Sequence, residues 1–279
     1  MNPPERLERL LDSPVIDVQQ PTGGHTRSWR GMVTTEAGTR VFVKAAADER
    51  TARSLRTEHS LYAALEADWL PVVWAWEDGP EPILILEDLS KAQWPPPWPA
   101  ESSILFPTLT RIADTRVPFD LEAMPPLEVS PWSEITADPA KITGLGIVDL
   151  EWIARHGTRL IELSSKIDLS GDDLIHADLG AGNLCFTKRG PVIVDWEYVS
   201  RGNRYLDVAT ALLDMRACHA PTPHVLPQPA AWASVLAGLM GIHASRPPPD
   251  WAADGTELRR LQRQLAKVAV EWVAELEGW

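Results

Sequence analysis

Apolar residues recur at two spacings in the first third of the chain, and the spacing separates strands from helices. Short runs rich in apolar residues predict five strands, at 15–20, around 29–33, and at 40–44, 72–77 and 83–86, and the run 40–44 alternates between apolar and polar residues. Helical spacing predicts a short helix at 5–12 and a longer one at 51–65. This part of the chain is therefore expected to combine a sheet with helices.

The rest of the chain is mainly helical in its pattern. Helices are expected at about 102–115, 146–166, 208–213, 230–244 and 256–276. Pro-rich stretches separate them, at 118–131, 221–229 and 246–250. The two parts differ enough in pattern to predict two structural regions.

A β-hairpin is predicted inside the stretch 174–197, which reads LIHADLGAGNLCFTKRGPVIVDWE. Two apolar runs flank the polar turn 187–190. Asp178 and Asn183 precede the first strand, and Asp195 follows the second. Because a hairpin brings its two ends together, these three residues are expected to lie close to one another.

Two carboxylates and an amide carbonyl suit Mg²⁺, which takes hard oxygen ligands and retains space for substrate phosphates. One carboxylate would remain to accept the proton of an attacking hydroxyl. Taken singly, each residue is common in solvated turns. Their order around one hairpin favours a functional site.

These residues resemble the aminoglycoside phosphotransferase and choline kinase superfamily, small-molecule kinases whose usual pattern is H-G-D-x-x-x-x-N followed by I-D-[WF]-[DE]. The chain has HADLGAGN and VDWE. The resemblance implies an α+β, protein-kinase-like fold with two lobes. Residues 1–89 would form a small nucleotide-binding lobe, an antiparallel sheet with one helix. Residues 90–99 would be the hinge or linker, and 100–279 a larger, mainly helical lobe for catalysis and substrate binding.

The resemblance also implies roles for the motif residues. Asp178 would be the catalytic base, and His176 would brace its loop. Asn183 and Asp195 would hold magnesium. Ala177 stands where the family usually has Gly, a difference that bears on the backbone just before the base.

A kinase-like site needs a strand Lys on the phosphates and a helix Glu to hold that Lys. Lys44 and Glu58 match this pair by element and order, and Glu49 is an alternative partner. Gly23 and Gly24 form a turn whose backbone N–H groups could face a phosphate. A plain hairpin turn is the alternative, and the resemblance supplies most of the case for the phosphate loop.

The backbone of Glu87 and Leu89 would bind adenine if the resemblance extends to the hinge. The following stretch 91–99, KAQWPPPWP, is expected to be stiff and similar to polyproline II. We interpret it as a strap between lobes, with a motif for a proline-reading partner as the alternative.

Asp207 precedes an apolar helical run, and we expect it both to cap that helix and to brace the catalytic loop. Glu197 and Asp214 are candidate ligands of the acceptor substrate, together with Glu271 and Glu275. Most of the thirteen tryptophans should lie in the core. Candidates for an acceptor pocket are Trp94, Trp98, Trp132, Trp232, Trp251 and Trp272.

Composition narrows the classes of protein. The 279 residues carry a formal net charge of −13, which disfavours nucleic acid and anionic membranes and favours cationic ligands. No apolar run approaches the ~20 residues of a membrane span. The two cysteines, Cys185 and Cys218, give no disulfide framework. A cytoplasmic monomer or homodimer is expected.

The predicted function is transfer of the γ-phosphoryl group of ATP, with Mg²⁺, to a hydroxyl of a small cationic molecule. An aminoglycoside or related antibiotic comes first, as in a resistance kinase, and choline, ethanolamine or thiamine second. A catalytically silent binding protein with the same fold is a further alternative. A protein kinase is disfavoured because no A-P-E signature follows Asp195 before the next helix.

Overall fold

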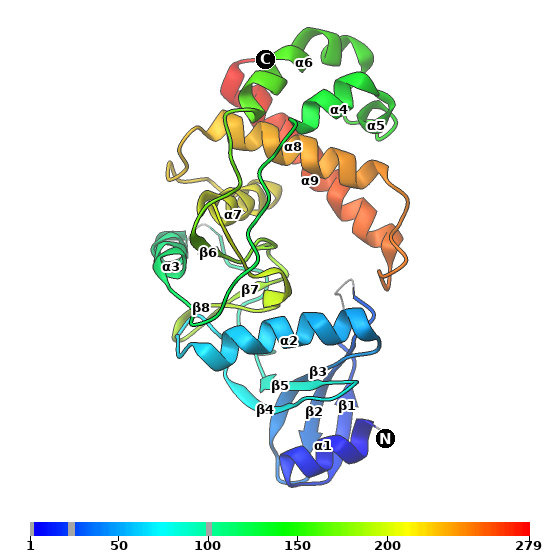
Figure 1. Ribbon diagram of the computed structural model, residues 1–279, viewed down its shortest axis with the longest axis vertical. Helices are drawn as coiled ribbons and strands as arrows, with labels where there is room; N and C mark the ends of the chain where they lie inside the picture. Colours follow the sequence, from blue (N-terminus) through cyan, green and yellow to red (C-terminus); the bar gives the residue numbers. More distant parts are fainter. Residues whose placement is uncertain (1–2, 22–25, 99–101) are drawn as a thin grey trace. The chain divides into compact units, whose positions relative to one another are not determined.

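The computed structural model describes residues 3–21, 26–98 and 102–279 (Figure 1). Contacts divide the chain into two compact units. Unit 1 comprises Met1–Pro96, Val117–Asp120 and Gly182–Val199. Unit 2 comprises Pro97–Arg116, Leu121–Ala181 and Ser200–Trp279. The predicted α+β fold class is confirmed, with an antiparallel sheet near the N-terminus and a helical C-terminal region. The predicted domain limits stay predictions.

Unit 1 is built on a five-stranded antiparallel sheet with the strand order β1-β2-β3-β5-β4. Its strands are β1 (Val15–Gln19), β2 (Trp29–Thr35), β3 (Arg40–Ala45), β4 (Val73–Glu77) and β5 (Ile83–Glu87). All five positions were predicted from short runs rich in apolar residues, and one face of the sheet is buried, with Val33, Val41 and Val43 fully covered. The central strand β3 therefore has a fixed register between β2 and β5.

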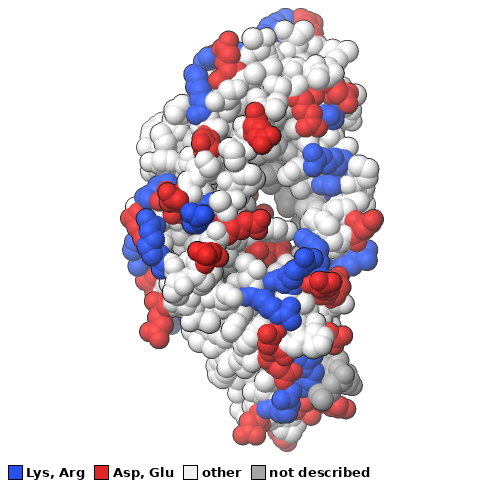
Figure 2. All heavy atoms as spheres, viewed as in Figure 1, with Lys and Arg blue, Asp and Glu red and all other residues white. Residues whose placement is uncertain are grey.

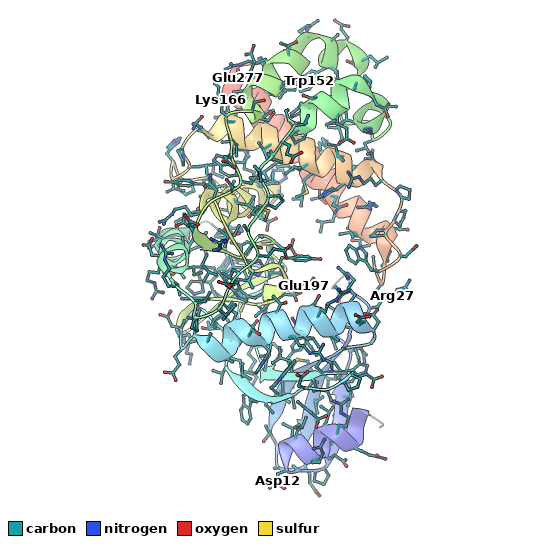
Figure 3. All side chains as sticks on the ribbon, in the orientation of Figure 1. Asp12, Arg27, Trp152, Lys166, Glu197 and Glu277 are labelled. Carbon is teal, nitrogen blue, oxygen red and sulfur yellow. The ribbon has the colours of Figure 1, made fainter. Side chains whose placement is uncertain are left out.

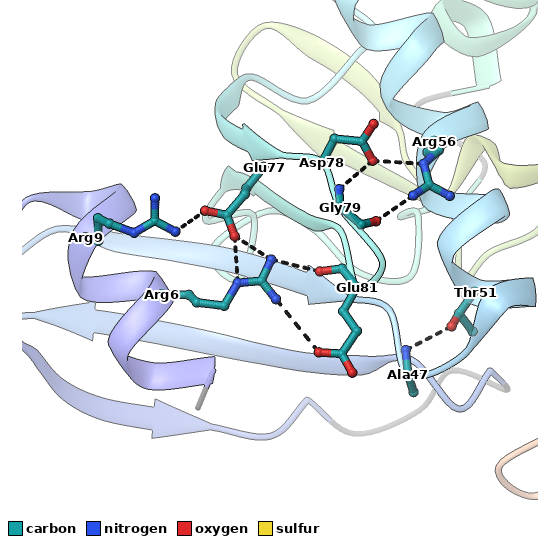
Figure 4. Close-up of polar contacts among 9 residues, drawn as sticks. All are labelled: Arg6, Arg9, Ala47, Thr51, Arg56, Glu77, Asp78, Gly79 and Glu81. Carbon is teal, nitrogen blue, oxygen red and sulfur yellow. Dashed lines mark hydrogen bonds and ion pairs between the residues drawn. The ribbon is translucent and has the colours of Figure 1, made fainter. Parts of the chain in front are cut away.

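Helix α1 (Pro3–Leu11) packs on this sheet through Leu7, which lies in the same buried cluster as Val41 and Ile85. Polar contacts tie the helix to the end of β4 (Figure 4). Arg6 Nε donates a 2.6 Å hydrogen bond to Glu77, and Arg9 pairs with the same carboxylate. Together the buried leucine and the ion pairs hold α1 in place.

Helix α2 (Glu49–Ala64) crosses unit 1 and begins at a capping box. The Thr51 N–H donates a 2.8 Å hydrogen bond to Asp48, and the Thr51 hydroxyl accepts from the backbone N–H groups of Ala47 and Asp48. Farther along the helix, Arg56 bonds the β4–β5 turn at Asp78 and Gly79 (Figure 4). These bonds fix the rotation of α2, so its buried face is well defined.

The predicted hairpin is present, as β7 (Leu184–Thr187) and β8 (Gly190–Ile193), and it belongs to unit 1. A 3₁₀ turn η1 (Trp196–Tyr198) follows it. Gln93 forms an antiparallel bridge with Phe186 on β7. Residues 90–98 run through turns and bends around this bridge, so the expectation of a polyproline II segment is wrong for this stretch. Its backbone finds hydrogen-bond partners on β7 instead.

Unit 2 is mainly helical and contains one small sheet. Its helices are α3 (Ser102–Asp114), α4 (Pro131–Ala137), α5 (Ala140–Thr143), α6 (Leu150–Ser164), α7 (Tyr205–Ala217), α8 (Pro229–Ser245) and α9 (Gly255–Glu277). The sheet pairs β6 (Asp173–Ile175) with β9 (Ser200–Gly202). Helices α8 and α9 run side by side (Figure 1). Helix α6 is shorter than predicted because the Asp149 side chain caps it, accepting from the Trp152 N–H at 2.8 Å.

The core of unit 2 takes up three tryptophans that were candidates for an acceptor pocket. Trp132, Trp232 and Trp272 are buried, and the Trp132 indole donates a 2.8 Å hydrogen bond to the carbonyl of Ser234. Their candidate role in an acceptor pocket is therefore wrong, because core packing buries all three rings and a backbone acceptor also holds that of Trp132. Trp94 and Trp251 remain partly exposed.

The C-terminal end of α9 is anchored on α6 (Figure 3). Arg159 Nε donates a 2.7 Å hydrogen bond to Glu277. Trp279 stacks on His156 with ring centroids 4.1 Å apart and meets the edge of Trp152 at 5.8 Å. Polar and aromatic contacts thus hold the end of α9 against α6.

Charged residues of both signs are interspersed over the visible surface, without a continuous basic patch (Figure 2). Within residues 3–21, 26–98 and 102–279, no helix has the length and apolarity needed to traverse a lipid bilayer.

Candidate active site

Lys44 is the centre of a buried ionic cluster in unit 1. It lies on β3, and its Nζ is 2.9 Å from Glu58 Oε1, 2.8 Å from Glu58 Oε2 and 2.8 Å from Asp195 Oδ1. Both Lys44 and Glu58 are almost fully buried. A buried ammonium is tolerated only with such partners, since an unpaired charge in the interior is costly. The structure therefore brings together a strand Lys, a helix Glu and the Asp after the hairpin.

The two carboxylates keep Lys44 protonated. Burial lowers the pKa of its ammonium, but the negative charges of Asp195 and Glu58 outweigh burial and leave the pKa above its usual value. Lys44 thus carries its charge at any physiological pH.

Tyr62 completes the cluster. Its hydroxyl donates a 2.7 Å hydrogen bond to Glu58 Oε1 from one turn farther along α2. Burial raises the pKa of Tyr62 well above its usual value, so the hydroxyl remains a donor. Glu49, the alternative partner for Lys44, lies in the exposed first turn of α2. The helix position of Glu58 therefore decides between the two candidates.

Asn183 and Asp195 lie at the open end of the β7–β8 hairpin. Leu184 pairs with Ile193, and beyond this pair the Val194 N–H donates a 2.9 Å hydrogen bond to the Asn183 carbonyl. Asp195 then takes a left-handed backbone conformation, with φ 65° and ψ 50°. The two residues predicted to hold magnesium are thus placed at adjacent positions, and their oxygen side chains are of the kind that Mg²⁺ binds.

A pocket opens beside this cluster within unit 1. Its lining consists of Thr26, Ser28, Arg30, Lys44, Thr51, Ser54, Leu55, Glu58, Asp195 and Glu197. Glu197, on η1, lies next to α2 (Figure 3). Burial, and then the charge of Asp195, raises the pKa of Glu197. The pocket combines cations, carboxylates and hydroxyls, a set of groups suited to phosphate and metal.

The loop with Asp178 lies in unit 2 and is held by helix α7. The backbone N–H of His176 donates a 2.7 Å hydrogen bond to Asp207 Oδ2, and that of Ala177 donates a 3.0 Å bond to Asp207 Oδ1. The His176 ring is fully buried, and its Nδ1 accepts the N–H of Asp178 at 3.2 Å. Asp178 itself lies at an exposed position.

Asp207 was expected to play two roles, and the structure contains one of them. The predicted brace of the loop is confirmed by its two backbone hydrogen bonds. The predicted N-cap is wrong, because α7 begins at Tyr205 and Arg204 occupies the cap position without a side-chain cap. Burial raises the pKa of Asp207 to about 6, although the N–H groups of His176 and Ala177 act in the opposite direction.

Asp214 holds the same loop from a second point on α7. Its Oδ2 accepts a short hydrogen bond from the Ala181 N–H. Burial raises the pKa of Asp214 to about 6, with the Ala181 bond opposing the rise. Asp207 and Asp214 are two helical turns apart and therefore lie on one face of α7. The predicted acceptor-binding role of Asp214 stays a prediction, alongside this observed contact.

Comparison with known proteins supports the resemblance that the motif indicated. Residues 172–228 match the family model described as "Phosphotransferase enzyme family". A thermostable mutant of an aminoglycoside phosphotransferase, in ternary complex with ADP and hygromycin B, is a similar structure. It shares 13% identity over 98% of this chain and 99% of that chain, with a TM-score of 0.59. The predicted resemblance to this superfamily is confirmed.

Two further phosphotransferase-like structures have the same fold. A macrolide 2′-phosphotransferase type I shares 13% identity over 97% and 96% of the two chains, with a TM-score of 0.55. A choline/ethanolamine kinase family protein from Mesorhizobium loti shares 15% identity over 91% and 93%, with a TM-score of 0.50. No curated protein matches the sequence. The family match contains the motif from His176 to Asp195, where its chemistry is expected.

The remaining predicted site residues occupy varied places. Gly23 and Gly24 lie outside the described residues. The Glu87 N–H donates a 2.9 Å bond to the Val72 carbonyl within the sheet. The Leu89 carbonyl accepts from the Ala92 N–H at 3.0 Å and from the Trp94 indole at 2.9 Å. Adenine binding by the backbone of Glu87 and Leu89 stays a prediction.

The sequence interpretation missed one residue of the ionic cluster, Tyr62, and several residues that line the pocket. Tyr62 could have been found from its position one turn after Glu58 on the same helix face. Arg30 faces the pocket because successive side chains of a strand point to opposite faces of the sheet. The side on which Arg30 lies could have been predicted from this alternation and from its buried neighbours on the strand. Thr26, Ser28 and Ser54 gave no signal, since hydroxyl residues are common at turns and on helices.

Proposed function

We propose that this protein is an ATP- and Mg²⁺-dependent phosphotransferase that phosphorylates a hydroxyl of a small molecule. The observation that carries the proposal is the contact of Lys44 with both Glu58 and Asp195 inside one pocket. A Lys on a strand, held by a helix Glu and set against a metal-binding Asp, is the arrangement that protein kinases use for phosphoryl transfer. The match of residues 172–228 to the phosphotransferase family supports the same reaction.

Each residue has a distinct part in the proposed reaction. Lys44 contacts the nucleotide phosphates, and Glu58 holds Lys44 in the orientation that this contact needs. Asn183 and Asp195 hold Mg²⁺, which when bound neutralises charge on the phosphates. These residues contribute placement and charge compensation, the main sources of catalysis in phosphoryl transfer.

Asp178 is the proposed catalytic base. The acceptor oxygen forms a bond to the γ-phosphorus, the bond from that phosphorus to the bridging oxygen breaks, and ADP leaves. The carboxylate of Asp178 orients the hydroxyl and takes its proton. The hydrogen bonds from His176 and Ala177 to Asp207 support this role, because they fix the backbone just before Asp178.

The proposed acceptor is a small cation such as an aminoglycoside or a related antibiotic, which would make the protein a cytoplasmic resistance kinase. The net charge of −13 supports a cationic ligand. Glu197 is the proposed contact for that charge, since it lines the pocket. The second candidate is an amino-alcohol such as choline or ethanolamine, favoured by the likeness to the choline/ethanolamine kinase family protein.

The test is release of ADP from ATP, measured by a coupled assay with a panel of acceptors. The panel contains aminoglycosides, a macrolide, choline, ethanolamine and thiamine, each with and without Mg²⁺. We expect Mg²⁺-dependent ADP release that one class of acceptor stimulates, and mass spectrometry of that acceptor should show one added phosphate. If the protein binds ATP and Mg²⁺ but no acceptor gains phosphate, the silent binding protein becomes the better interpretation.

A further inference from the structure

Arg30 is the second cation of the unit 1 pocket, and it lies directly across the sheet from Lys44. Strands β2 and β3 pair in an antiparallel register that sets Arg30 opposite Lys44. Side chains of directly opposed residues leave the sheet on the same face. Both residues line the pocket. The register therefore aims two cations at one space.

The two cations differ in how their charge is balanced. Lys44 is in contact with two carboxylates, those of Glu58 and Asp195. Glu197 adds a further carboxyl group to the lining. Lys44 alone therefore leaves the pocket with more acidic than basic groups, an environment that disfavours the phosphates of a nucleotide.

Arg30 has no such compensation. Within the part of the chain that the structure describes, it forms no ion pair, and its Nη2 donates a 3.3 Å hydrogen bond to the carbonyl of Thr26. One carbonyl uses one of the five N–H donors of a guanidinium. Arg30 is also half-buried, so solvent does not fully balance its charge. Such a cation has both the donors and the need for an anionic partner.

From this geometry we propose that Arg30 binds the terminal phosphates of the nucleotide and makes the pocket select nucleoside di- and triphosphates over monophosphates. The inference rests on the proposed function and deepens it. The planar fork of a guanidinium bonds two phosphate oxygens at once, which an ammonium cannot do. Lys44 then positions the phosphates, and Arg30 supplies a positive charge that is not already in contact with a carboxylate.

Two hydroxyls beside Arg30 extend the same surface. Thr26 Oγ1 and Ser28 Oγ lie 2.9 Å apart, and both line the pocket. The bond from Arg30 to the Thr26 carbonyl ties this hydroxyl pair to β2. Hydroxyls offer neutral donors to phosphate oxygens next to the guanidinium.

The experiment is isothermal titration calorimetry of the full chain with adenosine, AMP, ADP, ATP and inorganic tripolyphosphate, in the absence of acceptor. The variants are Arg30→Gln, which removes the charge, and Arg30→Lys, which keeps the charge and loses the fork. We expect Arg30→Gln to weaken ADP, ATP and tripolyphosphate by about 10- to 100-fold, the range for hydrogen bonds to charged groups. Adenosine and AMP should bind as they do to the wild type, and Arg30→Lys should fall between.

Arg56→Gln is the matched control, because Arg56 belongs to the same unit but bonds Asp78 and Gly79 and does not line the pocket. It makes the same change in net charge and should leave all five affinities unchanged. Equal weakening of adenosine and ATP by Arg30→Gln would overturn the inference, as would unchanged ATP affinity in that variant. A wild type that binds no nucleotide, with or without Mg²⁺, would instead remove the proposed function itself.

Discussion

The N–H of Ala177 donates a 3.0 Å hydrogen bond to Asp207 Oδ1 while the Ala177 backbone has a φ of 65°. A residue with a Cβ pays roughly 1–2 kcal/mol to occupy this left-handed region. The superfamily motif that this loop resembles usually has Gly here, so this chain keeps the loop conformation without the residue that adopts it most readily. The bonds to Asp207 are what offset the strain.

Ala177→Gly should stabilise the protein. The substitution removes the strain of the left-handed conformation, which stabilises the folded state. Gly also has more conformational freedom in the unfolded chain, which offsets part of this stabilisation. The free energy of unfolding should therefore rise by about 0.5–1 kcal/mol. Denaturant unfolding measures it. Ala181→Gly is the control, because Ala181 has no positive φ, and it should lower the same free energy. A loss of stability in Ala177→Gly would contradict the assigned backbone conformation.

The two aspartates of α7 should differ in their tolerance of amide replacement. Asp207 uses both oxygens on two N–H groups, so Asp207→Asn sets an NH₂ against a donor and should cost about 1–3 kcal/mol. Asp214 uses one oxygen on the Ala181 N–H, which an Asn carbonyl can replace. Thermal unfolding of the two variants tests the difference, and similar losses of stability would refute it.

Asp214→Asn should also change how stability depends on pH. Burial raises the pKa of Asp214 to about 6 in the folded protein, above the unfolded value of 3.8. Its contribution to stability is therefore fully present below pH 4 and is lost as pH rises toward 6, by at most about 3 kcal/mol. The free energy of unfolding of Asp214→Asn relative to wild type should rise over this range and level off above it. A pH-independent difference would show that Asp214 titrates normally.

Asp178→Ala should reduce turnover by roughly 10²–10⁴-fold, the usual contribution of a catalytic base, and leave ATP affinity unchanged. Steady-state ADP release and calorimetry give the two quantities. Asp172→Ala is a suitable control, since Asp172 is exposed in the same unit and pairs with the surface residue Arg201. Wild-type turnover in Asp178→Ala would remove this residue from the mechanism.

Asp195→Asn should abolish the part of nucleotide affinity that depends on Mg²⁺. The amide keeps the shape of the side chain but loses the charge that contacts Lys44 and that is proposed to hold the metal. Calorimetry with ATP, with and without Mg²⁺, separates the metal-dependent term. An undiminished effect of Mg²⁺ in this variant would move the metal site elsewhere.

Local periodicity was enough to predict most of the elements. The five strands of unit 1 and the helices α2, α8 and α9 each have one periodic face or a long apolar run, so their positions follow from the sequence. Strands β6 and β9 were missed because each has three residues and is stabilised by a partner far along the chain. Helices α4 and α5 are too short to show a period.

Some features of the candidate site could likewise be predicted from the sequence, and others could not. Lys44 and Glu58 follow from element type and spacing, and the hairpin accounts for the proximity of Asn183 to Asp195. The left-handed backbone conformation of Ala177 could not be predicted, since Ala has no preference for this region and the hydrogen bond to Asp207 that holds the loop is tertiary. The position of Arg30 required the register of β2 against β3, which periodicity alone leaves open.

The bond between Ala181 and Asp214 sets a rule for sequence divergence at this loop. Proline has no N–H, so a chain with proline at 181 would leave the Asp214 carboxylate without the donor that it now has. Replacements at the two positions must therefore occur together, for instance proline at 181 with an apolar residue at 214. In an alignment of homologous sequences, the residues at positions 181 and 214 should therefore change together.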